Sequence, residues 1–311
     1  MASAALKLVS TPVGELPESV VAPRMPLPVR VPAVVVPRAA WRDTVDEIAA
    51  RVLPSLVMLV VLLGVWQLAC SSPTSTFPSP SKVWTESHEV IVRPLKGLGF
   101  DWASGITVTD GADVGILVHI ATSLELVAIG YSLAAIAGIA LGVLIGQSVV
   151  AFRALDPLFQ VLRTVPPLAW LPLSLAAFQQ AQPATIFLIF VTAIWPVILN
   201  TAAGVQAIPP AYRNVAKVLA LSPVEFFFKI MLPATVPYMF TGLRIGVGMS
   251  WLAIVAAEMV QGGTGIGFFI WDSYNSSLLT DTIVALVYIG LVGFGLDRLV
   301  AALGRRIGRE A

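Results

Sequence analysis

Residues Pro210–Pro233 read PAYRNVAKVLALSPVEFFFKIMLP and separate two long apolar parts of the chain. The stretch carries three basic residues and one acidic residue, with Ser222-Pro223 near its middle. Because proline is tolerated in the first turn of a helix but not inside one, the pattern predicts a helix, a break and a second helix. The second helix enters apolar sequence at Leu232-Pro233. We expect this polar interruption to be a surface that a partner outside the membrane contacts.

Composition predicts a membrane protein. Of the 311 residues, 57% are hydrophobic and 12% are charged, and the mean hydropathy is +0.86. Soluble domains have about 45–50% apolar and about 25% charged residues, so we predict an all-α, polytopic membrane protein. A formal net charge of +1 without a basic cluster argues against a nucleic-acid partner. The single cysteine, Cys70, has no partner for an internal disulfide.

Six apolar segments predict six transmembrane helices, since about 20 apolar residues cross a bilayer core. They cover residues 53–70, 117–146, 164–178, 184–203, 234–259 and 278–299. Pro166, Pro167 and Pro172 interrupt the third segment. We therefore expect a kinked or late-starting helix there, whose freed backbone groups face protein or water.

The second segment has a face of small residues. Gly138, Gly142 and Gly146 recur at every fourth position, which predicts close packing against another helix. The stretch after this segment is predicted to be a short charged connection, carrying Arg153, Asp156 and Arg163.

The predicted domains are a tail and a membrane part. Residues 1–40 are rich in Pro, Val and Ala, and their prolines prevent a continuous helix. We expect a disordered cytoplasmic tail there, with an amphipathic membrane-surface anchor as the alternative. Residues 41–311 form the predicted transmembrane domain. Within it, residues 71–115 are polar and turn-rich, and a short helix is expected after Pro80.

The basic residues predict the orientation in the membrane. They gather at the two ends of the membrane domain and in alternate connections, at Arg42, Arg51, Arg153, Arg163, Arg213, Lys217, Lys229, Arg298, Arg305, Arg306 and Arg309. The connections after the third and fifth segments contain no Lys or Arg, and residues 71–115 hold more acidic than basic residues. Both termini and residues 210–233 are therefore predicted to be cytoplasmic.

This cytoplasmic stretch resembles a known family. Permease subunits of bacterial ATP-binding cassette (ABC) importers carry Glu-Ala-Ala, three residues, Gly, nine residues, Ile, one residue and Leu-Pro before their penultimate span. Here the register falls on Asn214-Val215-Ala216, Ala220 and Ile230-Met231-Leu232-Pro233. The spacing fits throughout, with Asn in place of Glu, Val in place of Ala and Ala in place of Gly.

The wider sequence resembles the nitrate, sulfonate and taurine branch over residues 50–305. The matching segments are DPLFQVLRTVPPLAWLP, PYMFTGLRIGVGMSWLAIVAAEM and GIGFFIWDSYNSS. NVAKVLALS and GFFIWDSYNSS most resemble the cyanobacterial nitrate/nitrite and bicarbonate subgroup, with cyanate permeases close by. The resemblance implies a type I ABC importer permease fold in the bacterial inner membrane. It implies import of a small anion, with nitrate or nitrite favoured over bicarbonate or cyanate.

The resemblance also implies partners. The sequence has no Gly-x-x-x-x-Gly-Lys-Ser/Thr phosphate loop, so we expect no enzyme activity, and ATP bound by separate ATPase subunits. Residues 210–232 correspond to the coupling helix that contacts those subunits. The implied contact set is Tyr212, Asn214, Val215, Ala216, Val218, Leu219 and Ala220, of which Tyr212, Val215, Val218 and Leu219 form an apolar ridge. A second permease subunit, expected as a homodimer, and a periplasmic or lipid-anchored anion-binding protein are also implied. No catalytic residue, cofactor or metal is expected in this chain.

Charged residues inside the spans are the candidates for the substrate pathway, because a charge at membrane depth is costly. Arg244 is the first candidate, eleven residues after Pro233 and about 16 Å into the helix. Arg163, Glu125 and Glu258 are the others. Alternatively, Arg244 pairs with Glu258 or Glu125 in a purely structural role.

Two further expectations complete the set. The four glycines between residues 262 and 267 predict a tight re-entrant turn on the outer side. A secondary transporter driven by an ion gradient is the alternative functional class, although no inverted repeat of the kind such proteins often carry is visible.

Overall fold

The computed structural model describes residues 40–72, 75–101, 105–108 and 114–310. Contacts divide the chain into two units, Met1–Leu59 and Val60–Ala311. The described part of the first unit is the N-terminal portion of helix α1, Ala40–Ala69. The tail predicted for residues 1–40 lies outside the described residues apart from Ala40, where α1 begins.

Five of the six predicted membrane spans are present as long helices. In the described part of the chain, five helical stretches are long and apolar enough to cross a membrane: Val52–Ala69, Ile116–Gly146, Ala181–Gln206, Pro223–Gln261 and Leu279–Gly308. The second and third stretches are helices α4 (Ile116–Gly146) and α7 (Ala181–Gln206). The fourth stretch contains α10 (Leu232–Gln261), and the fifth lies within α12 (Leu279–Glu310). A sixth crossing exists only if a bent pair of helices counts as one span.

That bent pair corrects the sequence analysis. Residues 149–164 were expected to be a short charged connection, but they form a regular helix, α5 (Val149–Thr164). Helix α6 (Pro167–Phe178) follows after a break, at 91° to α5. The two prolines of Pro166-Pro167 lack N–H donors, and a residue before proline avoids the helical region, so the chain turns sharply at Val165 (φ −66°, ψ 121°).

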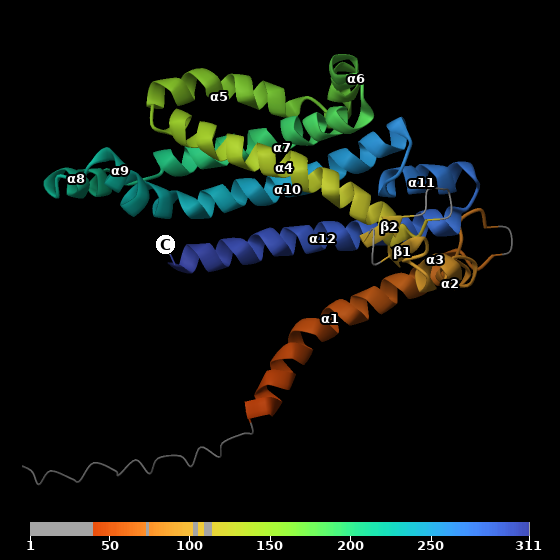
Figure 1. The fold of residues 1–311 in the computed structure, drawn as a ribbon. Helices are drawn as coiled ribbons and strands as arrows, with labels where there is room; N and C mark the ends of the chain where they lie inside the picture. The colour runs from red at the N-terminus through yellow and green to blue at the C-terminus, as the bar shows by residue number, and fades with distance from the viewer. Residues whose placement is uncertain (1–39, 73–74, 102–104, 109–113, 311) are drawn as a thin grey trace, which may run out of the picture. The chain divides into compact units, whose positions relative to one another are not determined.

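The short elements lie at the two ends of the long helices (Figure 1). At one end are α2 (Pro80–Glu86), α3 (His88–Val92), α11 (Ile266–Asn275) and two short strands. At the other end are α8 (Pro210–Val218), α9 (Pro223–Phe226) and the π-helical turn η2 (Phe227–Met231). The strands β1 (Leu98–Asp101) and β2 (Gly105–Val108) pair antiparallel, with Leu98 opposite Val108. This hairpin is an addition to the predicted all-helical fold.

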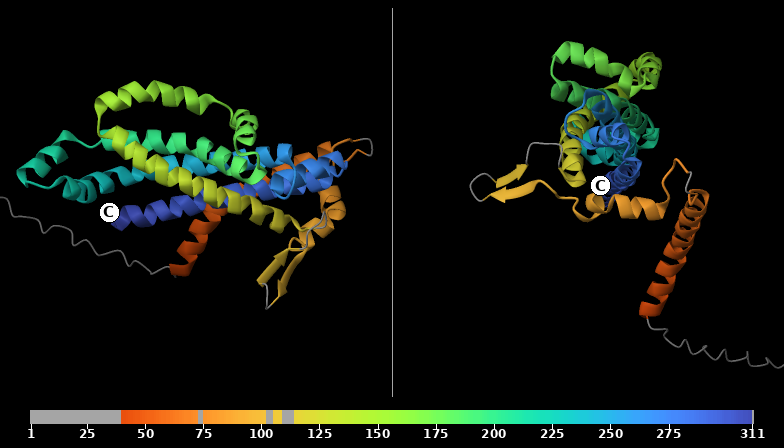
Figure 2. Two further views of the ribbon diagram at one scale, coloured as in Figure 1. Left: turned by 45° about the horizontal axis from the view of Figure 1, so that its top comes forward. Right: turned by 90° about the vertical axis from the view of Figure 1, so that its right-hand side faces the viewer.

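Helix α7 is the centre of the bundle (Figures 1 and 2), in contact with α4, α5, α6 and α10. Two-thirds of its most apolar window is buried. The predicted glycine face of α4 packs directly on it. A Cβ on Gly138 would lie 2.8 Å from Val197, and one on Gly142 would lie 2.6 Å from Thr201 and 2.9 Å from the Ile198 carbonyl oxygen. The backbones approach this closely because no side chain stands between them.

Helix α12 joins the bundle through α10. The indole Nε1 of Trp251 donates to the Ile289 carbonyl at 3.0 Å, and the ring lies against Gly293. Because a buried indole N–H needs an acceptor, this bond fixes the height of α12 along α10.

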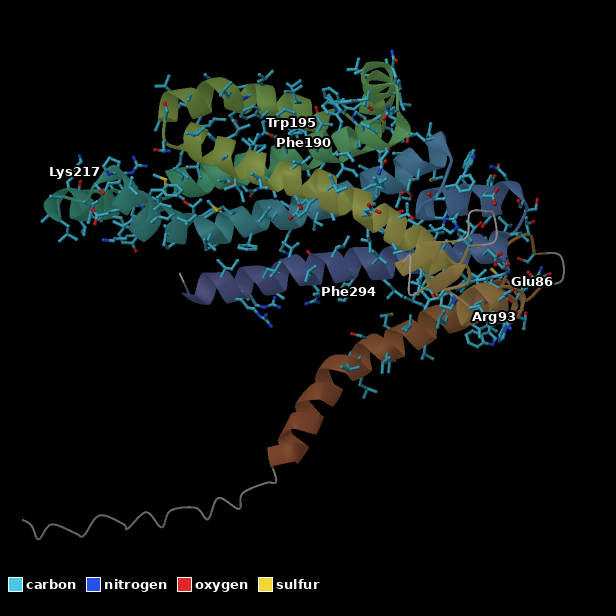
Figure 3. The ribbon with its side chains drawn as sticks, in the orientation of Figure 1. Glu86, Arg93, Phe190, Trp195, Lys217 and Phe294 are labelled. Carbon is cyan, nitrogen blue, oxygen red and sulfur yellow. The ribbon has the colours of Figure 1, made fainter. Side chains whose placement is uncertain are left out.

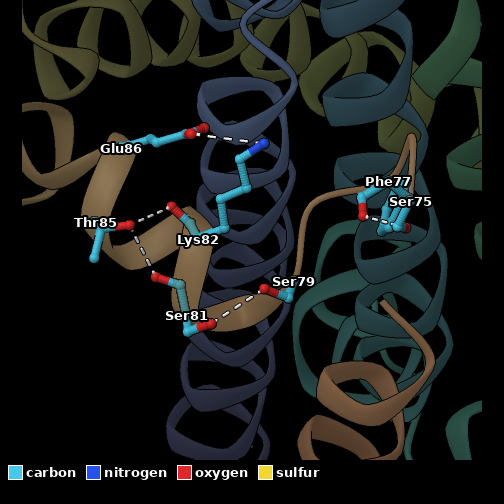
Figure 4. A network of polar contacts seen from close by, with 7 residues as sticks. All are labelled: Ser75, Phe77, Ser79, Ser81, Lys82, Thr85 and Glu86. Carbon is cyan, nitrogen blue, oxygen red and sulfur yellow. Dashed lines mark hydrogen bonds and ion pairs between the residues drawn. The ribbon is translucent and has the colours of Figure 1, made fainter. Parts of the chain in front are cut away.

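Polar contacts join residues 75–86, which lead into α2 and form it (Figure 4). The hydroxyl groups of Ser79 and Ser81 are hydrogen-bonded at 3.1 Å, and Thr85 Oγ1 donates to the Ser81 carbonyl at 3.2 Å. Gln67 at the end of α1 both donates to and accepts from Ser81, each at 3.1 Å. The short helix expected after Pro80 is therefore confirmed, and its Val83 belongs to the same apolar core as Trp251.

The α4–α7 contact generates a stability prediction. Gly142→Ala places a methyl group against backbone that cannot retreat, and we expect a loss of about 1–3 kcal/mol and a clear fall in melting temperature. Gly290→Ala on α12, where a Cβ meets nothing within 4 Å, is the control and should not lower it. Equal melting temperatures for the two purified variants would contradict the packing described here.

Candidate functional site

Helix α8 has well-defined ends. Pro210 occupies its first turn, and the Tyr212 N–H donates to the Pro209 carbonyl at 3.0 Å. At the other end Ala220 has φ +49°, its N–H bonds to the Lys217 carbonyl at 3.1 Å, and the Leu221 N–H bonds to the Ala216 carbonyl at 3.0 Å. This is a Schellman motif, in which a left-handed residue closes the helix. The predicted break is therefore present, and an alanine occupies the position that the family pattern gives to glycine.

A capping box starts the second helix. Ser222 Oγ accepts from the Glu225 N–H at 3.2 Å, while the Glu225 carboxylate accepts from the Ser222 N–H at 3.0 Å. Glu225 also pairs with Lys229 at 2.9 Å. The chain then passes from α9 through η2 into α10 without leaving helical geometry, so α8 is connected to a membrane span through the short break at residues 219–222.

The predicted ridge of α8 is exposed. Val218 is 85% exposed and Leu219 is 63% exposed, and about half of each of the Tyr212 and Val215 side chains is exposed. Asn214 is exposed as well, and Ala216 is the buried residue of this helix. A short helix that shows four large side chains with apolar surface offers a face suited to a groove on another protein.

Glu258 lies in a buried polar cluster near the C-terminal end of α10. Its carboxylate accepts from the Ser123 hydroxyl at 2.7 Å and from the Gly267 N–H at 2.9 Å. Ser123 also accepts from the Ile266 N–H at 3.0 Å, and His119 Nδ1 accepts from the Gly265 N–H at 3.2 Å. The cluster thus ties α4, α10 and the start of α11 together.

Gly265 has φ +148°, and a Cβ there would lie 2.3 Å from the Glu258 carboxyl carbon. The glycine lets the loop backbone approach Glu258, so the predicted tight turn between α10 and α11 is present.

Arg244 pairs with a residue that sequence analysis did not select. Its Nε and Nη2 donate to the two carboxylate oxygens of Asp297 on α12, at 2.9 Å and 2.8 Å. The expected partners, Glu258 and Glu125, are wrong: Glu258 lies in the cluster with Ser123, and in the described part of the chain Glu125 forms no ion pair. Asp297 is the only acidic residue in the interior of the last span, and this was the signal in the sequence that could have identified it.

The four pathway candidates are therefore not brought together. Arg244 lies about 18 Å from the start of α10, at 1.5 Å per residue, and its side chain is 48% exposed. Glu125 is exposed on α4, and Arg163 is exposed in the last turn of α5. Glu258 is 5% exposed. No group of three or more His, Cys, Asp or Glu side chains that could hold a metal occurs among the described residues.

His119 and Ser123 were also missed. They lie four residues apart on one face of an apolar span, a spacing that places both side chains toward the same neighbour. Only the fold shows that the neighbour is the glycine turn after α10.

Comparison with known proteins identifies the family. The family described as binding-protein-dependent transport system inner membrane component matches residues 134–309, more than half of the chain. The chain belongs to this family, and its fold is that of an ABC importer permease. It resembles a chain of the methionine transporter structure "Inward facing conformations of the MetNI methionine ABC transporter" with a TM-score of 0.50 and 16% identity, over 60% of this chain and 95% of that chain.

Three relatives show the branch. The chain is 55% identical over 279 residues to the nitrate import permease protein NrtB of Leptolyngbya laminosa, over 87% of this chain and 95% of that protein. It is 47% identical to the bicarbonate transport system permease protein CmpB of Synechocystis sp., over 86% and 91%. It is 33% identical to the taurine transport system permease protein TauC of Escherichia coli, over 87% and 93%. The resemblance to this branch is confirmed.

The Glu258 cluster generates the next prediction. Ser123→Ala leaves a carboxylate oxygen and the Ile266 N–H without their partner, and should cost about 1–3 kcal/mol. The neighbouring Thr122→Ala removes a hydroxyl that donates to its own helix, at Val118, and should cost less. Thermal unfolding of both variants in the same detergent measures the difference. A Thr122→Ala protein that melts at or below Ser123→Ala would show that the cluster contributes nothing special.

Proposed function

We propose that this chain is the membrane-spanning subunit through which an ATP-driven importer moves nitrate or nitrite across the inner membrane. The observation that carries the proposal is the exposed apolar ridge of α8, in a chain of this family that has no phosphate loop of its own. An exposed apolar helix face beside the spans needs a protein to cover it. ATPase subunits that bind ATP and contact α8 are that cover, and the chain itself has no enzyme activity and no cofactor.

The proposed orientation has both termini and α8 in the cytoplasm. The distribution of Lys and Arg supports it. The short elements α2, α3 and α11 then lie on the periplasmic side, where an anion-binding protein, free or lipid-anchored, delivers the substrate.

The pathway is proposed to run beside Arg244. A bidentate ion pair this far inside a helix, with about half of the arginine side chain exposed, is costly against lipid. A second copy of the chain and water between the copies would cover it. Glu258, which is buried and fully engaged, holds the outer end of α10 and has no direct part in the pathway.

Nitrate is proposed over bicarbonate because the nitrate permease relative shares 55% identity against 47% for the bicarbonate permease. Both substrates are small monovalent anions. Cyanate is a third candidate from the same resemblance. The secondary-transporter alternative gives no role to the ridge of α8.

Substrate identity can be tested in liposomes that hold this chain with its ATPase and binding protein. We expect ATP-dependent uptake of ¹⁵N-nitrate to exceed uptake of ¹⁴C-bicarbonate at equal concentration. Faster bicarbonate uptake would overturn the assignment of nitrate. Uptake by liposomes that lack the ATPase, driven by an ion gradient, would instead support a secondary transporter.

The ridge can be tested by adding charge. Val218→Asp or Leu219→Asp should weaken ATPase binding by about 2 kcal/mol or more, roughly thirtyfold, because a carboxylate replaces an apolar contact. Val224→Asp, which changes another exposed valine, on α9, is the control. Co-purification measures binding, and unchanged ATPase recovery with Val218→Asp would contradict the coupling role.

Arg244 can be tested with its partner. Arg244→Gln and Asp297→Asn each leave one charge unpaired, and both should impair assembly. The double variant removes both charges, and we expect it to recover assembly but not nitrate uptake, because the pathway cation is gone. Full recovery of uptake in the double variant would reduce the pair to a structural role.

A further inference from the structure

A cavity of about 340 Å³ lies on the side of α8 opposite to its ridge. Its lining includes Gln147 after α4, residues Arg213, Ala216 and Lys217 of α8, and Phe226 and Met231 from the turns that lead into α10. Figure 3 labels Lys217, at the end of the molecule where α8 and α9 lie. The cavity therefore lies between α8 and the ends of two spans.

Helix α8 carries two kinds of side chain on its exposed surface. Tyr212, Val215 and Val218 belong to the exposed apolar ridge, and the cations Arg213 and Lys217 are exposed as well but line the cavity. The proposed ATPase contact explains the ridge, but it does not explain two cations that line a largely apolar space.

The two cations have no anionic partner among the residues that the structure describes. Among the described residues, neither Arg213 nor Lys217 forms an ion pair, and the nearest acidic residue in the sequence, Glu225, is paired with Lys229 at 2.9 Å. Two positive charges side by side favour an anion from outside the chain.

The height of the cavity points to the membrane surface. Gln147 directly follows the end of α4 at Gly146, and Phe226 and Met231 lie in the first nine residues of the stretch Pro223–Gln261. The lining thus lies near the ends of two spans, where we expect the lipid headgroups.

We propose that this cavity binds an anionic phospholipid such as phosphatidylglycerol. Its phosphodiester would lie between Arg213 and Lys217, and its glycerol and first acyl carbons against Ala216, Phe226 and Met231. A free phosphate would gain the cations but lose hydration against the apolar walls, whereas a lipid uses both parts of the cavity. The inference rests on the proposed function only in placing α8 at the cytoplasmic leaflet.

A lipid in this position would support α8 from the membrane side while its ridge contacts the ATPase. Because only the break at residues 219–222 separates α8 from α9, η2 and α10, the lipid would help to keep the coupling helix aligned with a span. ATPase coupling is therefore expected to depend on anionic lipid.

The experiment is native mass spectrometry of the purified chain, with phosphatidylglycerol or phosphatidylcholine added in equal amounts. We expect phosphatidylglycerol to be retained preferentially, and the double variant Arg213→Gln/Lys217→Gln to lose at least about tenfold in retention. The double variant Arg305→Gln/Arg306→Gln removes two exposed basic residues of α12 that do not line the cavity, and should retain the lipid as the parent does. Both pairs are surface changes, so folding is expected to be unaffected and is checked by the melting temperature.

Equal retention in the two double variants, or no preference between the two lipids, would overturn the proposal. Inorganic phosphate added in excess should leave the lipid bound, and displacement would identify the site as one for free phosphate instead. These readouts need neither ATPase nor transport. Lipid retention without nitrate uptake would therefore contradict the proposed function alone, and uptake without retention would contradict only this inference.

Discussion

The close approach of α4 and α10 to α7 is the constraint on which the rest of the structure depends. Between helices surrounded by lipid there is no hydrophobic drive to associate, so contact area between backbones has to supply the attraction. Glycines on α4 meet Val197 and Thr201, and Gly242 on α10 meets the Pro196 carbonyl. With both neighbours in contact with α7, the ends of α4 and α10 are set in space, and the polar groups at those ends can meet.

The two ends of the bundle use different polar devices for different purposes. At one end a buried carboxylate, Glu258, collects a hydroxyl and a backbone N–H, and so closes the turn into α11 against α4. At the other end the Schellman motif and the capping box provide hydrogen-bond partners for the free backbone groups at the ends of α8 and α9. Helix α8 therefore needs no further cover from the bundle at its ends. The first arrangement stiffens the bundle, and the second presents a surface for other molecules.

Helix α8 is amphipathic toward two different surroundings. Among the described residues nothing covers its apolar ridge, and its two exposed cations line a cavity near the ends of two spans. In a water-soluble protein an uncovered ridge of large apolar side chains would be unfavourable. It becomes reasonable for a helix between a protein partner on one side and a membrane surface on the other.

The sequence by itself determined the class of fold, the places of five spans, the start of α8 and the break after it, because these follow from local hydropathy and from proline and turn chemistry. It also determined the glycine face of α4 and the family register over residues 214–233. It predicted a connection where α5 forms a helix, and missed the strands β1 and β2. Only the tertiary structure decided that Arg244 meets Asp297, that Glu258 meets Ser123, and that Arg213 and Lys217 line a cavity. The first two contacts join residues from different helices, and the cavity lies between different helices. Hydropathy and periodicity describe each helix separately, and so they contain no information on which faces meet.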